Sequence, residues 1–329
     1  MSTIRDVARQ AGVSSATVSH VINGTRYVSD AVRQRVIAAM KELNYRPNAI
    51  ARSLRSGNTN TIGLILPDSA NPFFAELGRE IEAAAFFSGY NVILCNSNGS
   101  VEQENSYINL LIEKQVDGII LDTEHEQIEN LCSQIPDGLP VVMVDRDLNN
   151  NPFDIVLCDN HQGGYVAARH FIESGFNRIA IIKGPAHLLS SHHRFDGYAA
   201  ALAESGLNVQ DELVYHGDFR TASGFEAGSA LLNQPHPPQA VFASNDMMAV
   251  GLIRAASVLT RRIPQDLAVI GFDDIEFGAY TYPSLSTIAQ PKKEIAKRAV
   301  ELLIDRFSNR EKPCNRELIP AHLVIRDST

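Results

Sequence analysis

The sequence predicts an all-α helix-turn-helix head followed by an α/β domain of two doubly wound parallel-sheet subdomains. Three observations lead to this prediction. Residues 3–26 have the apolar spacing of two short helices separated by Gly12. From Thr61 onward, short apolar segments alternate with amphipathic segments. The alternation runs through two consecutive series, which is typical of parallel sheets covered by helices on both faces.

The first helix of the head is predicted to begin after Thr3. Thr3 and Asp6 have the T-x-x-D spacing of a helix cap, and an apolar stripe follows over residues 7–11. Gly12-Val13 interrupts the helical pattern. Ser14 is a favoured N-cap residue, so a second helix is expected to follow it directly.

The second helix carries small and polar residues at the end that meets base edges in a helix-turn-helix protein. Val18, Val21 and Ile22 recur at helical spacing and form its apolar face. The positions left for DNA near its N-terminus are Ser15, Ala16, Thr17 and His20. Together with Thr3, these four residues form the DNA-binding surface that the pattern alone predicts.

Charge is distributed unevenly along the 329 residues. The whole chain is acidic, with 29 basic and 38 acidic residues. Residues 1–60 nevertheless hold nine basic and three acidic residues, a net charge of +6, whereas the remainder carries −15. A basic head on an acidic body indicates that only the head contacts phosphates.

A third helix is expected from Ser29 to Asn44, and a breaker at residues 45–47 follows it. Residues 48–57 have the spacing of one more short helix, which is marginal alone in water and would need a partner or DNA. Arg52 and Arg55 lie beside its apolar positions. Two interpretations remain open for this segment, a hinge helix and a simple linker.

Two series of apolar segments and intervening helices fill the rest of the chain. The expected strands of the first series are 61–66, 90–95, 118–122 and 140–145, with helices near 72–88, 101–114 and 124–134. The second series has strands 154–159, 178–184, 213–218, 239–244 and 267–273, with helices near 162–174, 191–205, 221–232 and 246–259. A ligand site is expected beyond the carboxyl ends of the strands.

Polar and aromatic residues collect where this rule places a ligand. Carboxylate, guanidinium and amide groups suit a polyhydroxylated ligand, and aromatic faces suit the C–H surface of a sugar ring. The residues concerned are Asn71, Phe73, Phe74, Asp145, Arg146, Arg194, Phe219, Asn245, Asp273 and Gln290. Each one alone also fits an ordinary structural role, such as a helix cap at Asn245 or core packing at Phe73. Their shared placement favours a common site.

Several classes of protein are disfavoured by what the sequence lacks. It has no P-loop, no G-x-S-x-G and no H-E-x-x-H motif, and no paired acids for acid–base work. The histidines 187, 192 and 193 and the four cysteines have no companions at metal-ligand spacing. No apolar run is long enough to span a membrane. We therefore expect a reduced, soluble, cytoplasmic protein that has no membrane partner, catalytic residues, metal or cofactor.

At the level of motifs, the chain resembles the lactose-repressor family of bacterial transcription regulators. The motifs that carry the resemblance are IRDVARQAGVS, TVSHVING, ELNYRPNAIARSLRSG, TIGLILPD, NPFF, VDGIIL, DNHQGG and VIGFDDIE. The resemblance implies a homodimer, or a dimer of dimers, on a pseudopalindromic operator, with a recognition helix in the major groove. It also implies that the hinge helices of two chains pair in the minor groove, where a leucine wedges open the central step.

This resemblance assigns further residues and boundaries. It places the minor-groove leucine at Leu54 and base-reading positions at Ser15, Ala16 and Arg26. It implies a head over residues 1–45, a hinge and linker over 46–60, and a periplasmic-binding-protein-like effector and dimerisation domain over 61–329. The N-subdomain would hold residues 61–159 and 291–318, and the C-subdomain residues 160–290 and 319–329. The ten strand-end residues named above match the sugar pocket of periplasmic ribose binders.

The expected function is therefore that of a sugar-responsive transcriptional repressor, not an enzyme, released from its operator by ribose or a similar pentose. Leu188 stands where the purine-responsive branch of the family uses a polar contact, which disfavours a purine effector. A regulator that responds to a purine or another metabolite remains an alternative, as does a sugar-binding transport protein. The operator, the choice between dimer and tetramer, and the choice between induction and co-repression stay open.

Overall fold

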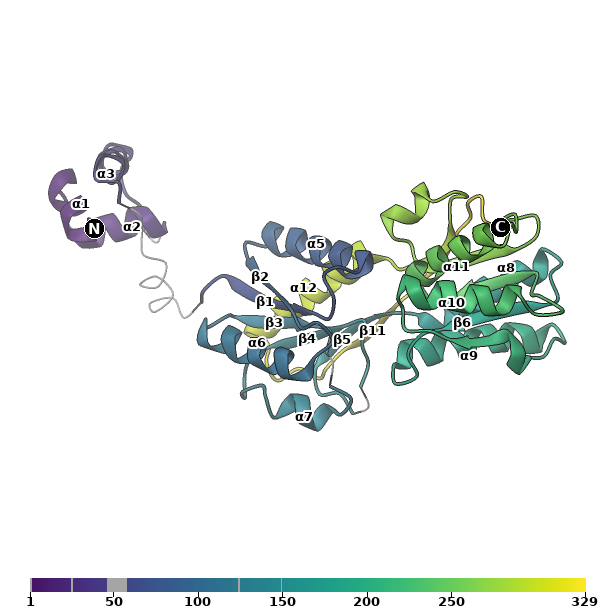
Figure 1. Cartoon of the computed structure of the whole chain (residues 1–329). Helices are drawn as coiled ribbons and strands as arrows, with labels where there is room; N and C mark the ends of the chain where they lie inside the picture. Colours follow the sequence, from purple (N-terminus) through teal and green to yellow (C-terminus); the bar gives the residue numbers. More distant parts are fainter. Residues whose placement is uncertain (1, 25, 46–57, 124, 149) are drawn as a thin grey trace. The chain divides into compact units, whose positions relative to one another are not determined.

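The chain divides into two units, residues 1–59 and residues 60–329, in the computed structural model, which describes residues 2–24, 26–45, 58–123, 125–148 and 150–329. The described part of the first unit is helical, and the second unit holds two six-stranded sheets covered by helices (Figure 1). This confirms the predicted fold class. Residues 46–57, which include Arg52, Leu54 and Arg55, lie outside the described residues.

The first unit contains α1 (Ile4–Ala11), α2 (Ser15–Asn23) and α3 (Asp30–Glu42). The predicted cap of α1 is present: Thr3 Oγ1 accepts the Asp6 N–H at 3.4 Å, and the Asp6 carboxylate accepts the Thr3 N–H at 2.9 Å. Gly12 ends α1 in the left-handed region, with φ 63°, and Ser14 then caps α2 through the Thr17 N–H. Local sequence therefore sets the turn between these two helices.

The core of the first unit forms where the apolar faces of its three helices meet. Val7, Val18 and Val36 come from α1, α2 and α3 and are fully buried. Ile37 on α3 lies outside this core, since 48% of this residue is exposed. Ala39 takes the place toward the core instead.

The first sheet of residues 60–329 has the strand order β11-β5-β4-β3-β1-β2, with all its pairs parallel. Its strands are β1 (Thr61–Leu66), β2 (Asn91–Asn96), β3 (Gly118–Leu121), β4 (Val141–Val144), β5 (Asp154–Cys158) and β11 (Arg316–Ile319). Helices α5 (Pro72–Phe87) and α12 (Lys292–Ser308) cover one face, and α6 (Val101–Glu113) and α7 (Ile128–Cys132) cover the other. We call this sheet with its helices the N-subdomain.

The second sheet has the order β12-β10-β9-β8-β6-β7. Its strands are β6 (Ile179–Lys183), β7 (Val214–His216), β8 (Ala240–Ala243), β9 (Ala268–Asp273), β10 (Ser286–Ala289) and β12 (His322–Val324). Helices α8 (Asn160–Glu173) and α9 (Leu189–Glu204) pack on one face, and α10 (Thr221–Leu232) and α11 (Asp246–Val258) on the other. Two short 3₁₀ helices, η1 (Asp211–Leu213) and η2 (Glu276–Tyr280), lie in its loops. We call this sheet with its helices the C-subdomain.

Glycines allow the helix pairs of the C-subdomain to approach closely. A Cβ added to Gly164 on α8 would lie 2.0 Å from the carbonyl oxygen of Arg194 on α9. A Cβ added to Gly251 on α11 would lie 2.1 Å from the carbonyl oxygen of Thr221 on α10. Because the obstructing atoms belong to the backbone, a larger residue could not fit without moving a helix.

Several predicted details of the second unit are wrong. The strand at 154–158 completes the first sheet, because β5 pairs with β4 and β11. The series of apolar segments placed it with the second sheet, whereas the boundary implied by the resemblance kept residues 61–159 together. The second sheet is not wholly parallel, since β12 runs antiparallel to β10. The helix expected over 124–134 is formed only at Ile128–Cys132. Among the described residues, no helix is long and apolar enough to cross a membrane.

Candidate functional site

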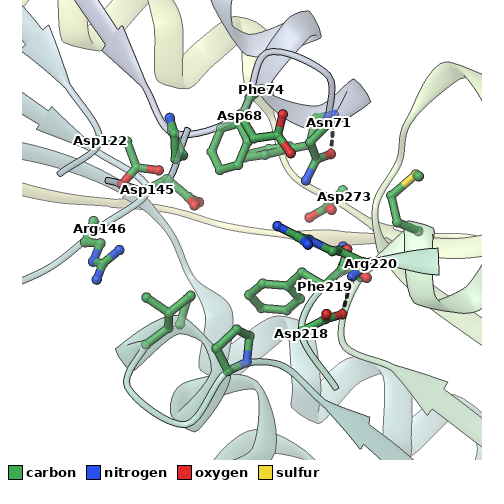
Figure 2. A pocket seen from close by; sticks show the side chains of 18 of the residues that line it. Asp68, Asn71, Phe74, Asp122, Asp145, Arg146, Asp218, Phe219, Arg220 and Asp273 are labelled. Atoms are coloured by element: carbon green, nitrogen blue, oxygen red, sulfur yellow. Dashed lines mark hydrogen bonds between the residues drawn. The ribbon is translucent and has the colours of Figure 1, made fainter. Parts of the chain in front are cut away.

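A cavity of about 680 Å³ lies in the second unit, at the carboxyl ends of the strands, and residues of both subdomains line it. All ten residues that the sequence assigned to a ligand site line this cavity. They are Asn71, Phe73, Phe74, Asp145, Arg146, Arg194, Phe219, Asn245, Asp273 and Gln290. In Figure 2, Asp145 and Asp273 lie on opposite sides of the cavity, with the ring of Phe74 above and the ring of Phe219 below the space between them. The structure thus brings the predicted residues together, and their binding role stays a prediction.

Arg194 is a buried, positively charged residue on the C-subdomain side of the cavity. It is 3% exposed, and its Nε donates to Asn160 Oδ1 at 2.7 Å while Nη1 donates to the Ser244 carbonyl at 2.6 Å. Its guanidinium carbon lies 3.7 Å from the centre of the Phe272 ring, and Nη1 is 3.9 Å from Asp273 Oδ1. These contacts fix the positively charged guanidinium group of Arg194 in one position at the cavity wall.

Asp273 and Gln290 form a hydrogen-bonded pair on the same side. Gln290 Nε2 donates to Asp273 Oδ1 at 2.9 Å, and both residues are nearly buried. Burial raises the pKa of the Asp273 carboxyl to about 6, and the neighbouring Arg194 guanidinium opposes this rise. Gln290 Oε1 has no hydrogen-bond partner among the described residues. A buried acceptor of this kind indicates a ligand that donates hydrogen bonds.

Asp145 and Arg146 contribute from the end of β4 in the N-subdomain. Burial raises the pKa of Asp145, whereas the Arg194 and Arg146 guanidinium groups lower it. Asp145 Oδ1 is a second cavity acceptor that has no hydrogen-bond partner in the described part of the chain. Each subdomain therefore offers at least one acceptor that a donor on a ligand would satisfy.

Asn71 and Asn245 serve both as helix caps and as cavity walls. The side chain of Asn71 accepts the Phe73 N–H at the start of α5, and that of Asn245 accepts the Met248 N–H at the start of α11. The structural role that the sequence suggested for Asn245 is thus present together with its place at the cavity. Two helix N-termini therefore open onto the cavity.

Aromatic rings form the apolar part of the wall. Phe73 and Phe74 meet edge to face, with ring centres 5.1 Å apart. Phe219 comes from the opposite subdomain, and its ring lies against Gly184, where an added Cβ would be 2.2 Å from the ring. Such faces can cover the C–H side of a sugar ring.

Unusual backbone conformations concentrate at this cavity. Four cavity residues, Asn98, Asp145, Phe219 and Asp273, have positive φ, with Asp273 at 113°. Residues other than glycine seldom adopt this region, and they persist in it only where the surrounding structure holds them. Their concentration around one cavity supports a functional role for it.

Sequence reasoning missed the outer acidic wall of the cavity. Among the described residues at the wall, six are aspartates and three are arginines. The wall residues that the sequence did not single out include Asp68, Asp122, Asp147, Asp218 and Arg220. Asp122 directly follows β3, so the rule of strand ends could have found it. No group of three metal-ligating side chains occurs in the described part of the chain.

The helix-turn-helix unit places its predicted DNA residues on its surface. Ala16 and Arg26 are exposed, and Ser15, Thr17 and His20 are half-buried near the exposed side of α2. Thr3 is exposed but already bonded to Asp6. Tyr27, which the sequence reasoning passed over, is 95% exposed beside Arg26. Exposed Arg5 and Arg9 add positive charge to this unit.

Comparisons with known proteins agree with both units. Residues 3–48 match the family described as bacterial regulatory proteins, lacI family, and residues 168–329 match the periplasmic binding protein-like domain. The Ribose operon repressor of Escherichia coli (strain K12) is 43% identical over 310 residues, which cover 94% of each chain. The HTH-type transcriptional repressor PurR of Photobacterium profundum is 38% identical over 331 residues, covering 100% of this chain and 98% of PurR. This chain belongs to the lacI family.

Solved structures of lacI-family proteins have the same fold. The Lac repressor bound to ONPG in the repressed state superposes with a TM-score of 0.89 at 28% identity, covering 100% of this chain and 99% of the other. A family regulator from Enterococcus faecium with bound ribose gives a TM-score of 0.71 at 31% identity, covering 82% and 98%. Proteins of the lacI family are transcriptional repressors that bind operator DNA and small-molecule effectors and act as dimers. The chain is thus a DNA-binding transcriptional repressor of this family.

Proposed function

We propose that a small, uncharged sugar, D-ribose or a similar pentose, binds in the cavity and releases this repressor from its operator. The relatives alone leave the effector undecided, because ribose and purine repressors are about equally similar to the chain. The choice therefore depends on the chemistry of the cavity wall. A repressor of this kind would act in the cytoplasm.

The observation that carries the proposal is the pair of acceptors without partners on opposite subdomains. Asp145 Oδ1 and Gln290 Oε1 are buried and lack hydrogen-bond partners among the described residues. Ring hydroxyls of a pentose can donate to both, and one hydroxyl can also accept from Arg194 or Arg146. The faces of Phe74 and Phe219 would then cover the C–H surfaces of the sugar ring.

The charge of the wall favours a neutral ligand over a phosphorylated one. Six aspartates against three arginines make the described wall negative, and Arg194 is already engaged by Asn160, Ser244 and Asp273. A phosphate group would meet like charges in a partly dehydrated site. We therefore expect sugar phosphates to bind more weakly than the free sugar.

A purine effector is the second candidate, because the PurR relatives match the whole chain. A purine ring presents several acceptor nitrogens, which suit the acidic wall less well than hydroxyl donors do. Leu188 adds an apolar side chain to the wall, at the position where the purine-responsive branch of the family is expected to have a polar contact. These features favour the sugar.

For DNA, we propose that Ser15, Ala16 and Thr17 on α2, with His20 and Arg26, face the major groove. The head is taken as residues 1–45 and the hinge as 46–60, with Arg52, Leu54 and Arg55 at the minor groove. A Leu54→Ala variant should lose operator affinity far more than affinity for random DNA, because an apolar wedge acts only where the DNA kinks. Competition between operator and random duplex measures the ratio of the affinity for operator to the affinity for random DNA.

We propose that residues 61–329 also form a homodimer through exposed apolar side chains. Phe86 and Phe87 at the end of α5 are 66% and 87% exposed, and Leu94 on the edge strand β2 is 55% exposed. Phe277 and Tyr280 on η2 are exposed as well. Large exposed apolar side chains of this kind are candidates for burial in an interface. Light scattering of a Phe87→Glu variant should show a shift toward monomer.

Titration calorimetry of the full chain with D-ribose, D-ribose 5-phosphate and hypoxanthine tests the proposed effector. We expect binding of D-ribose alone, and an affinity lowered at least about tenfold in an Asp145→Asn variant through loss of a charge-assisted bond. Binding of hypoxanthine in place of ribose would contradict the proposal. A gel shift with the same preparation distinguishes a repressor from a sugar-transport protein or a sugar-processing enzyme, because neither would retard operator DNA.

A further inference from the structure

The loop that follows β9 has an unusual backbone and carries a cavity residue. Asp273 and its neighbour Asp274 have φ values of 113° and 52°. Two consecutive aspartates in this region need outside support to stay there. The carboxylate of Asp273 lies at the cavity, so the support of this loop also determines where that carboxylate is held.

Lys292, the first residue of α12, provides part of that support. Its ammonium group donates to the carbonyl oxygens of Asp273 and Asp274, each at 2.7 Å. It also lies 3.1 Å from Glu76 Oε2. Three acceptors thus match the three N–H bonds of the ammonium group. Both side chains of the pair are largely buried, with 13% of Lys292 and 15% of Glu76 exposed.

Glu76 extends this support to the other subdomain. It belongs to α5, whose first turn carries the cavity residues Phe73 and Phe74. Its second carboxylate oxygen, Oε1, accepts the N–H of Glu276 at 2.8 Å, in the turn after Asp274. One carboxylate therefore contacts the loop at its far end directly and at its start through Lys292.

Asp246 holds the same loop from inside the C-subdomain. It is fully buried, and its carboxylate accepts the Ile275 N–H at 2.9 Å and the Thr287 hydroxyl at 2.6 Å. Since all three of these residues belong to the C-subdomain, they can fix the loop but cannot relate it to α5. The contacts of Glu76 and Lys292 join the loop to that N-subdomain helix.

We propose that Glu76 and Lys292 are positioning residues that set effector affinity through the backbone of Asp273. Neither residue lines the cavity. They fix the left-handed backbone of Asp273 and couple it to α5, so that a ligand held by Asp273 is also held against the first turn of that helix. The inference rests on the proposed function, because it takes the cavity as the effector site.

A double-mutant cycle tests this role. In the wild-type background, Lys292→Met is expected to lower D-ribose affinity about tenfold by titration calorimetry. In an Asp273→Asn background, the same change should lower it by less than about twofold, because Lys292 acts through Asp273. Equal losses in both backgrounds would show an ordinary structural effect and overturn the proposal. If the wild type binds hypoxanthine instead, the cycle is run with hypoxanthine.

Hydrogen exchange of the full chain without ligand provides an independent measurement. Glu76→Ala removes the acceptor of the Glu276 amide, so exchange at Glu276 should speed up at least about tenfold. Glu80→Ala is the matched control, because Glu80 lies one turn further along α5 and pairs with the adjacent Arg79. Unchanged exchange at Glu276 in Glu76→Ala would overturn the proposal. Faster exchange in a protein that does not bind D-ribose would overturn the proposed effector alone.

The milder variant Glu76→Gln guards against misfolding. It keeps an acceptor oxygen for the Glu276 N–H but removes the charge that faces Lys292. We expect a several-fold loss of D-ribose affinity with an unchanged thermal midpoint. A wild-type affinity in this variant and in Lys292→Met would overturn the proposed role.

Discussion

The two sides of the cavity are built differently. The C-subdomain residues Arg194, Asn245, Asp273 and Gln290 are 2% to 4% exposed and bonded to one another or to nearby main chain. The N-subdomain residues Asn71, Phe74, Asp145 and Arg146 are only half-buried, although the Asp145 Oδ1 atom and the Phe73 side chain are buried. The inner part of the C-subdomain wall is therefore held by contacts within the protein before a ligand arrives, whereas more of the N-subdomain wall is reached by solvent.

This difference indicates a division of roles in binding. A fixed wall loses little conformational entropy when it binds a ligand, so it contributes to affinity and to the choice of ligand. An open wall gains contacts only when it meets the ligand, so it can report that the ligand is present. We infer that the C-subdomain selects the effector and that the N-subdomain, whose strand β1 follows residues 46–60 directly in the chain, closes on it.

The largest expected effect is on the packing that fixes the C-subdomain wall. Gly164→Ala would place a Cβ 2.0 Å from the backbone oxygen of Arg194, so α8 and α9 must separate. We expect a loss of about 3 kcal/mol or more in the free energy of unfolding. The matched control is Gly78→Ala on α5, whose nearest neighbour is the Leu66 side chain at 3.2 Å. Chemical denaturation measures both, and equal losses would contradict a more rigid C-subdomain.

Substitutions of Arg194 and Arg146 should affect ligand binding alike but stability differently. Arg194→Met leaves the buried oxygens of Asn160 and Ser244 without their donor, so stability should fall by about 2 kcal/mol. Arg146→Met, on the half-buried side of the cavity, should cost less stability than Arg194→Met, because Arg146 is more exposed. Both variants should lose at least about tenfold in D-ribose affinity. Thermal unfolding and calorimetry distinguish the two, and an unfolded Arg146→Met would refute the comparison.

A smaller effect is expected from pH. Burial raises the pKa of Asp273 to about 6, so the folded state binds a proton at this carboxyl more readily than the unfolded state does. Lowering the pH from about 7 to about 5 should therefore stabilise the ligand-free protein by about 1 kcal/mol through this group. The same change removes the carboxylate that a sugar hydroxyl would donate to, so D-ribose affinity should fall about tenfold. Calorimetry at both pH values checks this. An Asp273→Asn variant should lose most of the pH dependence of stability and of D-ribose affinity. If that pH dependence is unchanged in the variant, a group other than Asp273 causes it.

Much of the fold follows from local signals in the sequence. The caps at Thr3, Ser14 and Asn245 and the apolar segments indicated the predicted helices and strands to within a few residues, but α12 and the strands β10, β11 and β12 were not predicted. What failed depends on pairing between distant segments. The apolar pattern of residues 154–158 fits either sheet, and only the partners β4 and β11 decide between them.

The site was predicted as a set of residues but not as a set of interactions. Strand ends converge in a parallel sheet, so Asp145 and Asp273 could be expected near one cavity. Arg194 lies in α9, and its bonds to Asn160 and Ser244 depend on how α8 and β8 pack beside it. The contact between Glu76 and Lys292 joins residues that are far apart in the chain, and no sequence pattern indicates it.

The most direct test measures whether a sugar in this cavity controls DNA binding. An operator is selected from random duplexes by the protein itself, and its affinity is followed by fluorescence anisotropy as D-ribose is added. The proposed function predicts release by D-ribose at concentrations near its calorimetric affinity and no release by D-ribose 5-phosphate or hypoxanthine. In Asp273→Asn, release should need higher D-ribose concentrations while the operator affinity is kept. Operator binding that saturating D-ribose leaves unchanged, or that hypoxanthine controls, would contradict it.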